Sequence, residues 1–192
     1  MKKARTASVK KKMRRRKKRK EFYKELSKEL ILTLLVVLFL FFLCSKVVFS
    51  LPENEGYGML NTLTDGDRVY VNRFGEPKRF SLIYFNQPDG NGTSIRRVIG
   101  VGGEHVRYVN DELYIDDRLV IERFLLKELS QAEIDDEIVT KDFDSIDIQG
   151  VENGLIPKGK YLVLGDNRRY ATDSRYYGLV DEKEIIGTVV LP

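Results

Sequence analysis

The sequence feature that most constrains this chain is a long apolar run near its N-terminus. Leu30–Cys44 reads LILTLLVVLFLFFLC, fifteen residues in which Thr33 is the one polar residue. Ser45 and Lys46 interrupt the run, and further apolar residues then continue it. A bilayer core needs about 20 helical residues, so the extended run is long enough if the charged end of Lys46 reaches the interface. We therefore expect a membrane-spanning helix over residues 21–50.

A cleaved signal peptide is the alternative interpretation of this run. The apolar span is longer than that of a usual signal peptide, and no small-x-small cleavage site follows it before Gly56. We therefore expect an uncleaved signal-anchor. Cys44 is the one cysteine of the chain, so no disulfide can form within it.

Charge is distributed unevenly on the two sides of the run. Residues 1–20 contain thirteen Lys or Arg and no Asp or Glu, whereas residues 51–192 contain 17 Lys or Arg against 26 Asp or Glu, a net charge of −9. Because basic residues stay on the cytoplasmic side, we expect a cytoplasmic tail that contacts membrane lipid. The acidic part is then expected on the outer face of the plasma membrane. It would repel phosphate, which excludes nucleic acid as its partner.

Residues 51–192 have the pattern of a mainly β domain. Short alternating segments separated by glycine- and proline-containing turns are typical of antiparallel strands. A tight hairpin turn is expected at Asp116-Asp117-Arg118, and the weakly patterned acidic stretch 122–156 is interpreted as an inserted, cap-like excursion, partly helical over Ser130–Glu137. Strands are expected over residues 67–72, 81–85, 95–99, 105–109, 113–115, 119–121, 161–164 and 185–190.

Three stretches of this domain resemble the type I signal peptidase family. GMLNTLTDGDRVYV, from Gly58, is similar to the family's first box, usually Ser-Met-x-Pro-Thr-Leu and then Gly-Asp. IRRVIGVGGEHV, from Ile95, is similar to Ile-Lys-Arg-Val-Ile-Gly-x-Pro-Gly-Asp. GDNRRYATDSRYYG, from Gly165, is similar to Gly-Asp-Asn-Arg followed by Ser-x-Asp-Ser-Arg. The resemblance covers residues 50–192 together with the preceding helix.

The resemblance implies a fold and an activity. The fold is an antiparallel β-sheet domain around a substrate groove, with an inserted cap, preceded by one transmembrane helix. Members of the family cut signal peptides from exported proteins on the outer membrane face, with a serine nucleophile and a lysine general base. No cofactor or metal is expected, and the acidic stretch lacks the EF-hand pattern of a calcium site.

This sequence differs from the family at the positions of the catalytic side chains. Gly58 stands where the nucleophilic serine is expected, Arg96 where the lysine is expected, and Ala171 where a second serine often orients that lysine. Glycine offers no nucleophile, and arginine stays protonated because its pKa lies above about 12. Lowering that pKa to neutrality would require about 7 kcal/mol. No intact catalytic residue is therefore expected, and Asn61 also replaces the first-box proline.

The framework residues of the boxes are nevertheless present, so we expect the scaffold to keep its shape. Asp173 and Arg175 are expected to form a buried ion pair. The expected groove residues are Gly56, Tyr57, Gly58, Met59, Asn61, Ser81, Tyr84, Ser94, Ile95 and Arg96. The expected structural motif consists of Gly165, Asp166, Asn167, Arg168, Asp173, Ser174 and Arg175.

Ser94 is the nearest candidate for a substitute nucleophile, because alternate residues of a strand point to the same face and Ser94 therefore lies beside Arg96. It would still need a neutral base. His105 is the one histidine, and we interpret it as structural. Ser174 is likewise interpreted as a framework residue, and Ser81 as a residue that lines the groove without a catalytic role.

Three functions remain open from the sequence. The main interpretation is an inactive, signal-peptidase-like membrane protein that binds an extended peptide by strand addition. Non-catalytic members of the family are associated with sortase-dependent pilus assembly, so the resemblance implies pilin subunits and a sortase as partners. The alternative is an active signal peptidase with a substituted nucleophile such as Ser94. The third is a scaffold that uses only the acidic cap surface.

Overall fold

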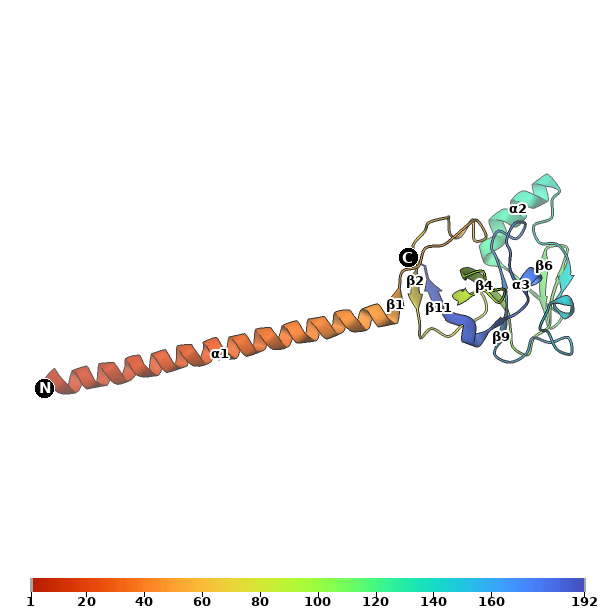
Figure 1. Cartoon of the computed structure of the whole chain (residues 1–192). Coiled ribbons are helices and arrows are strands. Elements are labelled where there is room, and N and C mark those ends of the chain that lie inside the picture. Colours follow the sequence, from red (N-terminus) through yellow and green to blue (C-terminus); the bar gives the residue numbers. More distant parts are fainter. Residues whose placement is uncertain (1, 192) are drawn as a thin grey trace. The chain divides into compact units, whose positions relative to one another are not determined.

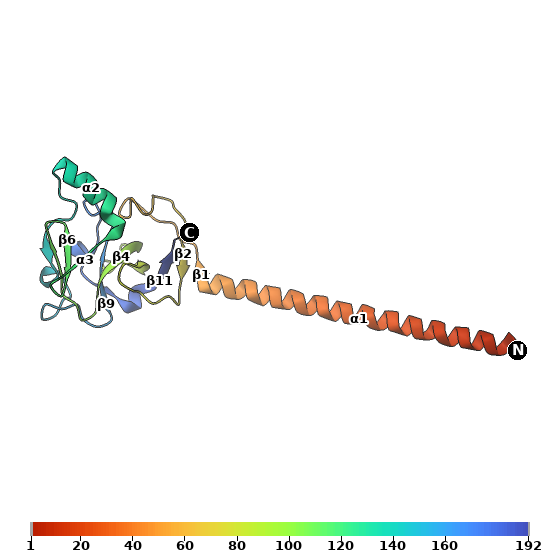
Figure 2. The same cartoon turned by 180° about the vertical axis from the view of Figure 1, so that it is seen from behind.

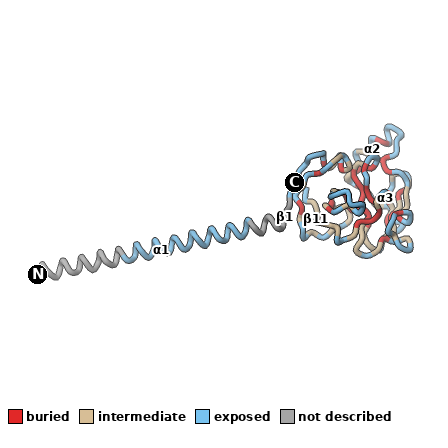
Figure 3. Tube along the Cα trace, in the orientation of Figure 1, coloured by how far each residue is buried: buried red, intermediate tan, exposed pale blue. Residues whose placement is uncertain are grey.

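The structure, a computed structural model, describes the backbone of residues 2–191 and the side chains of residues 18–42 and 51–191. The chain divides into two compact units, Met1–Val47 and Val48–Pro192. The first unit is the helix α1, whose bounds are Lys2–Val48 (Figure 1). The described residues of this helix are exposed, whereas the second unit contains long buried stretches (Figure 3).

No helix is both long and apolar enough to cross a membrane within the part of the chain whose residues the structure describes. The predicted span continues through residues 43–50, whose side chains lie outside the described residues.

The second unit contains two antiparallel sheets, as the alternating pattern predicts. The larger sheet has seven strands in the order β1-β2-β11-β3-β4-β9-β10, and the smaller has four in the order β7-β6-β5-β8. In the larger sheet these strands are Phe49–Ser50, Tyr70–Asn72, Ile185–Val190, Leu82–Asn86, Thr93–Val101, Lys160–Leu164 and Val180–Asp181. In the smaller sheet they are Arg118–Val120, Glu112–Ile115, Val106–Val109 and Phe143–Asp144. Figures 1 and 2 show the two sheets from opposite sides.

The hairpins of the smaller sheet follow from their turn residues. Asn110 and Asp111 have φ of 50° and 65°, and Asp116 and Asp117 have φ of 49° and 61°. Two successive residues with positive φ make the tight turn that matches the twist of paired strands, and asparagine and aspartate tolerate this region well. The predicted turn is therefore confirmed at Asp116-Asp117, whereas Arg118 already belongs to β7.

The stretch 122–156 differs from its prediction. Its helix α2 spans Leu126–Asp135, rather than residues 130–137, and ends where Asp136 adopts a left-handed backbone with φ of 53°. Leu125 and Val139 are buried, and β8 pairs with β5 in the smaller sheet. Parts of this stretch are thus packed into the domain, because apolar residues spaced too irregularly to give a periodic signal still reach the core.

The remaining short helices close loops between strands. They are the 3₁₀ turns Arg123–Leu125, Ser145–Asp147 and Glu182–Glu184 and the single α-helical turn α3, Ser174–Tyr177. The Asp173 side chain caps α3 by accepting a hydrogen bond from the Arg175 backbone N–H. A short polar side chain before the first turn satisfies a backbone donor that the helix itself leaves unpaired.

A buried ion pair joins the two sheets and the α2 stretch. Arg168 Nη2 lies 2.5 Å from Glu122 Oε1, and both side chains are almost completely buried. The Tyr108 hydroxyl donates to Glu122 at 2.8 Å and accepts from Arg168 at 2.9 Å. Burial is the main cause that raises the pKa of Tyr108. Because each charge is paired and hydrogen-bonded, removing one partner would leave the other buried alone.

We predict that Arg168→Leu lowers the free energy of unfolding by about 3–5 kcal/mol, because it leaves the Glu122 carboxylate buried without a counter-charge. Arg169→Leu is the matched control, since the neighbouring Arg169 pairs with Glu137 at the surface and such pairs contribute about 1 kcal/mol or less. Urea denaturation followed by circular dichroism measures both. Equal losses in the two variants would contradict the assignment.

Candidate functional site

The segment around Gly58 is a tight turn anchored by one methionine. The backbone N–H groups of Thr62 and Leu63 donate to the carbonyl of Met59 at 3.0 and 2.8 Å. The Met59 side chain is fully buried and packs in one cluster with Leu63 and Ile95. Burying a side chain of this size contributes about 1.5–3 kcal/mol, so Met59 holds Gly58 in place against β4.

The last-box loop, residues 165–173, holds the other side of this turn. The Asn167 backbone N–H donates to the Gly58 carbonyl at 3.1 Å, and Asn167 Nδ2 donates to the Tyr57 carbonyl at 2.9 Å. A Cβ on Gly165 would lie 2.5 Å from the Gly58 carbonyl oxygen and 2.3 Å from the Ala171 Cβ. Only glycine allows this close approach, which explains why the Gly-Asp-Asn-Arg loop begins as it does.

Arg96 occupies the space beside Gly58. Its Nε and Nη2 both donate to the Thr172 carbonyl, at 3.0 and 2.9 Å, and its Nη1 donates to the Ile95 carbonyl at 2.6 Å. A Cβ on Gly58 would lie 2.9 Å from Cζ and Nη2 of Arg96 and 3.2 Å from Nη1. The guanidinium therefore lies where a side chain at position 58 would begin. Its hydrogen bonds to the Thr172 and Ile95 carbonyls hold it there.

The expected structural motif forms two ion pairs around this loop. Arg97 donates to Asp166 through Nε at 2.8 Å and Nη2 at 2.5 Å, and Thr62 also hydrogen-bonds Asp166. Arg175 contacts Asp173 at 2.7 Å, as the sequence predicts, and the Asp173 side chain is fully buried. These pairs tie β4 and the first-box turn to the last-box loop.

Ser174 also has a structural place. Its Oγ accepts the backbone N–H of Val163 at 2.9 Å, and the residue is buried. Asp173 Oδ2 likewise accepts the N–H of Gly165 at 3.0 Å. Both side chains thus satisfy backbone donors of β9 and the loop after it.

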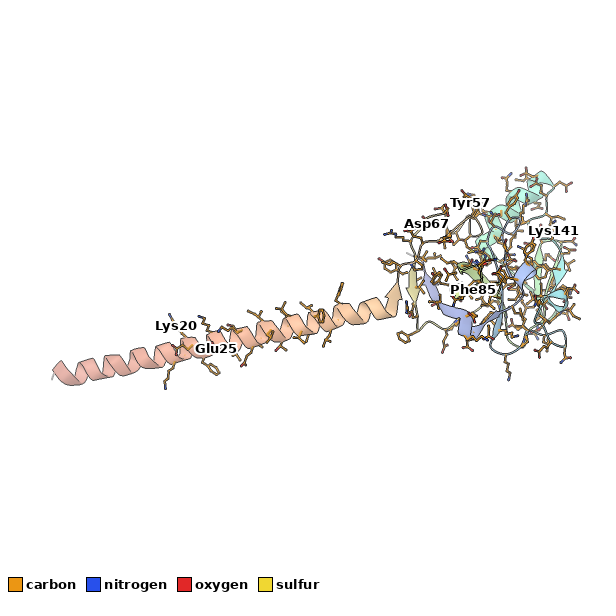
Figure 4. The ribbon with its side chains drawn as sticks, in the orientation of Figure 1. Lys20, Glu25, Tyr57, Asp67, Phe85 and Lys141 are labelled. Atoms are coloured by element: carbon orange, nitrogen blue, oxygen red, sulfur yellow. The ribbon has the colours of Figure 1, made fainter. Side chains whose placement is uncertain are left out.

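The structure brings together only some of the predicted groove residues. Tyr84 packs against the cluster that contains Met59 and Ile95, and Tyr57 is 66% exposed at the edge of the unit (Figure 4). Ser81 has a structural place instead. Its hydroxyl donates to the Lys78 carbonyl and accepts from the Lys78 backbone N–H, and these hydrogen bonds close a local turn.

Two residues near Gly58, Gly56 and Asn61, have positive φ. Gly56 has φ of +76°, and its N–H donates to Asp65 Oδ1 at 2.7 Å. Asn61 has φ of 90°, a region that proline cannot adopt. Proline at position 61 would therefore require a different turn in this chain.

Ser94 and His105 are not brought together as a nucleophile and base. Ser94 is half-buried on β4 opposite Phe85 in the larger sheet. His105 precedes β5 in the smaller sheet, and its Nε2 lies 2.7 Å from Asp144 Oδ1. Burial raises the pKa of Asp144, but hydrogen bonds from the Ile146 N–H and from His105 outweigh burial and lower it. The histidine thus belongs to a separate ion pair.

Two features of the site could not be read from the sequence. A pocket of about 350 Å³ between α2 and the last-box loop is lined by Asn61, Asp166 and Asn167, among others. Glu128 also lines it, and its Oε2 is buried without a hydrogen-bond partner in the described residues. The Tyr177 hydroxyl is likewise buried and unpartnered in that part of the chain. Burial is the main cause that raises the pKa of Tyr177.

Known proteins resemble this chain over most of its length. Residues 27–192 match the family described as signal peptidase, peptidase S26. Signal peptidase I V of Bacillus subtilis (strain 168) is 39% identical over 150 residues, which cover 75% of this chain and 85% of that protein. Signal peptidase IB of Staphylococcus aureus (strain Mu50) is 36% identical over 160 residues, covering 80% of this chain and 82% of that protein.

A solved structure gives the same relationship. The crystal structure of a signal peptidase I from Enterococcus faecalis V583 is 34% identical, with a TM-score of 0.55, and the match covers 60% of this chain and 97% of that one. The antiparallel domain, the three sequence boxes and this similarity agree, and the chain therefore belongs to the signal peptidase family, peptidase S26.

Proposed function

We propose that this chain is a signal-peptidase-like protein that binds an extended peptide and does not cleave it. The observation that carries the proposal is the position of the Arg96 guanidinium, 2.9 Å from where a side chain on Gly58 would begin. The family's chemistry needs a hydroxyl and a neutral amine at these two places. Here one place has no side chain, and the other holds a cation that fills the space between them.

Arg96 also cannot act as the base. A guanidinium stays protonated at any pH at which the protein is folded. In all three of its hydrogen bonds, to the Thr172 and Ile95 carbonyls, Arg96 is the donor. Ala171 is buried and offers no hydroxyl to orient it.

The edge of β4 supports peptide binding. β3 pairs with β4 along Thr93–Arg97, whereas the register with β9 begins only at Arg97. In the described part of the chain, residues 93–96 therefore have a partner strand on one side only. We call these residues and Tyr57–Met59 the proposed groove. An unpaired strand edge binds an extended peptide through its backbone, with side chains entering alternate positions.

Partners and location follow as parts of the same proposal. The family implies signal peptides as ligands of the groove, and the acidic, phosphate-repelling domain suits a protein ligand. Residues 1–50 would anchor the chain in the plasma membrane, with the basic tail in the cytoplasm and the β domain outside. Pilin subunits and a sortase, in a pilus-assembly role, are the more specific partners that we propose from the inactive site.

An active signal peptidase is the second candidate, and the relatives favour it, because they carry the name signal peptidase I. It would need a nucleophile from another position, and Ser94 is the hydroxyl on the same strand face as Arg96. In the described residues no hydrogen bond connects Ser94 to a base, and the one histidine is paired with Asp144.

We predict no cleavage when the full-length chain is incubated with a signal-peptide substrate and the products are followed by mass spectrometry. The B. subtilis relative named signal peptidase I V serves as the positive control. Cleavage that disappears in Ser94→Ala would establish the second candidate and end the non-catalytic proposal.

Repair of the site is expected to need three changes together. Gly58→Ser, Arg96→Lys and Ala171→Ser restore the hydroxyl, the ionisable amine and its orienting group, so weak hydrolysis should appear above background. Gly58→Ser alone should remain inactive, because its Cβ meets the Arg96 guanidinium and no base is present. Full activity of the single variant in the same assay would refute the assignment of Arg96.

Crosslinking tests binding at the proposed groove. A photoreactive phenylalanine analogue in place of Tyr57, which is exposed on its rim, should capture a signal peptide. The same analogue in place of Phe74, which is 75% exposed outside the groove, is the matched control. Capture at position 57 that exceeds capture at position 74 several-fold supports the proposal. Equal capture at both positions argues against a groove and favours a scaffold that uses another surface.

A further inference from the structure

Arg96 differs from the other buried and half-buried arginines of the domain in having no acidic partner. It is 7% exposed, and in the portion of the chain that the structure describes no carboxylate forms an ion pair with it. Every other buried or half-buried arginine has such a partner: Arg79 with Glu104, Arg97 with Asp166, Arg107 with Asp117, Arg168 with Glu122 and Arg175 with Asp173. Burying a charge without a counter-charge is unfavourable, so this site lacks a negative group.

Arg96 also retains unused hydrogen-bond donors. A guanidinium carries five N–H groups, and three of them donate to the Thr172 and Ile95 carbonyls. One N–H therefore remains on each terminal nitrogen. These nitrogens lie 2.9 and 3.2 Å from the position of a Cβ on Gly58, and the three nearest atoms outside residues 57–59 all belong to Arg96. Because residue 58 has no side chain, no side-chain atom of its own covers them.

A second donor without an acceptor lies within electrostatic reach of Arg96. The Tyr177 hydroxyl is buried and has no hydrogen-bond partner in the described part of the chain. Burial raises the pKa of Tyr177, and the positive charge of Arg96 opposes that rise. The Asp173 carboxylate also acts on Tyr177, but it is paired with Arg175. Tyr177 and Arg96 therefore both keep donors that a further acceptor could satisfy.

We propose that Arg96 binds the free α-carboxylate at the C-terminus of a peptide in the proposed groove, an inference that rests on the proposed function. A carboxylate supplies two acceptor oxygens and a negative charge, and it matches the paired N–H groups of a guanidinium. The carbonyl of an uncut chain supplies one acceptor and no charge. The site thus selects peptides that have already been cut.

The chemistry of this ligand indicates which reaction supplies it. Hydrolysis of a peptide bond creates a new α-carboxylate on the N-terminal fragment, so a protease acts before this protein binds. Gly58 allows the end of that fragment to approach Arg96, whereas a side chain at position 58 would enter the same space.

The test compares two peptides on the unaltered full-length chain in detergent. Both contain the same apolar segment and end in Ala-x-Ala, the form of a signal-peptide cleavage site. One ends in a free carboxylate and the other in an amide, and fluorescence anisotropy measures the affinity of each. The acid is expected to bind about 10- to 100-fold more tightly, since a hydrogen-bonded charge pair contributes that much more than a neutral contact.

Variants locate the effect. Arg96→Gln should bind the two peptides with equal affinity, whereas Arg123→Gln, a change at an exposed arginine in the turn before α2, should keep the preference for the acid. Equal binding of acid and amide by the unaltered chain would overturn this inference and leave peptide binding intact. Binding of neither peptide would contradict the proposed function, and with it this inference.

Discussion

The position of the Arg96 guanidinium is the constraint on which the character of this site depends. Two backbone carbonyls from different segments hold it, Thr172 from the last-box loop and Ile95 from its own strand. A flexible cation would otherwise lie in solvent, and these contacts keep it beside Gly58 instead. The same contacts that tie the loop to β4 therefore also keep the guanidinium where a side chain on residue 58 would begin.

The surrounding framework is held by close backbone approaches and buried ion pairs. Gly165 approaches Gly58 and Ala171 so closely that a Cβ would clash with both. Asp166 binds Arg97 and Thr62, and Arg168 binds Glu122 in the interior. The close approach at position 165 requires glycine, because it leaves no room for a Cβ. The buried arginines and carboxylates require each other, because a buried charge needs a partner. These contacts together fix the first-box turn beside β4 and the last-box loop.

Local pattern predicted those parts of the fold that local physics determines. Alternating segments became strands, and Asp116-Asp117 became a tight turn because aspartate tolerates positive φ. Prediction of α2 failed at both ends, since its start depends on burial of Leu125 and its end on the backbone of Asp136. The strands β8 and β10 have two residues each, too few to show an alternating pattern of polar and apolar residues. They are recognised only by their pairing with β5 and β9.

The sequence alone determined which groups the site contains: no hydroxyl at position 58, a permanent cation at position 96 and no hydroxyl at position 171. It also determined the family boxes and the separation of basic and acidic residues along the chain. Only the tertiary structure decided where the cation lies. The direction of the Arg96 side chain depends on two carbonyls, that of the neighbouring Ile95 and that of Thr172, which is distant in sequence. The tertiary structure likewise decided which arginines are neutralised, since an ion pair such as that of Arg168 and Glu122 forms between residues that folding alone brings within hydrogen-bonding distance.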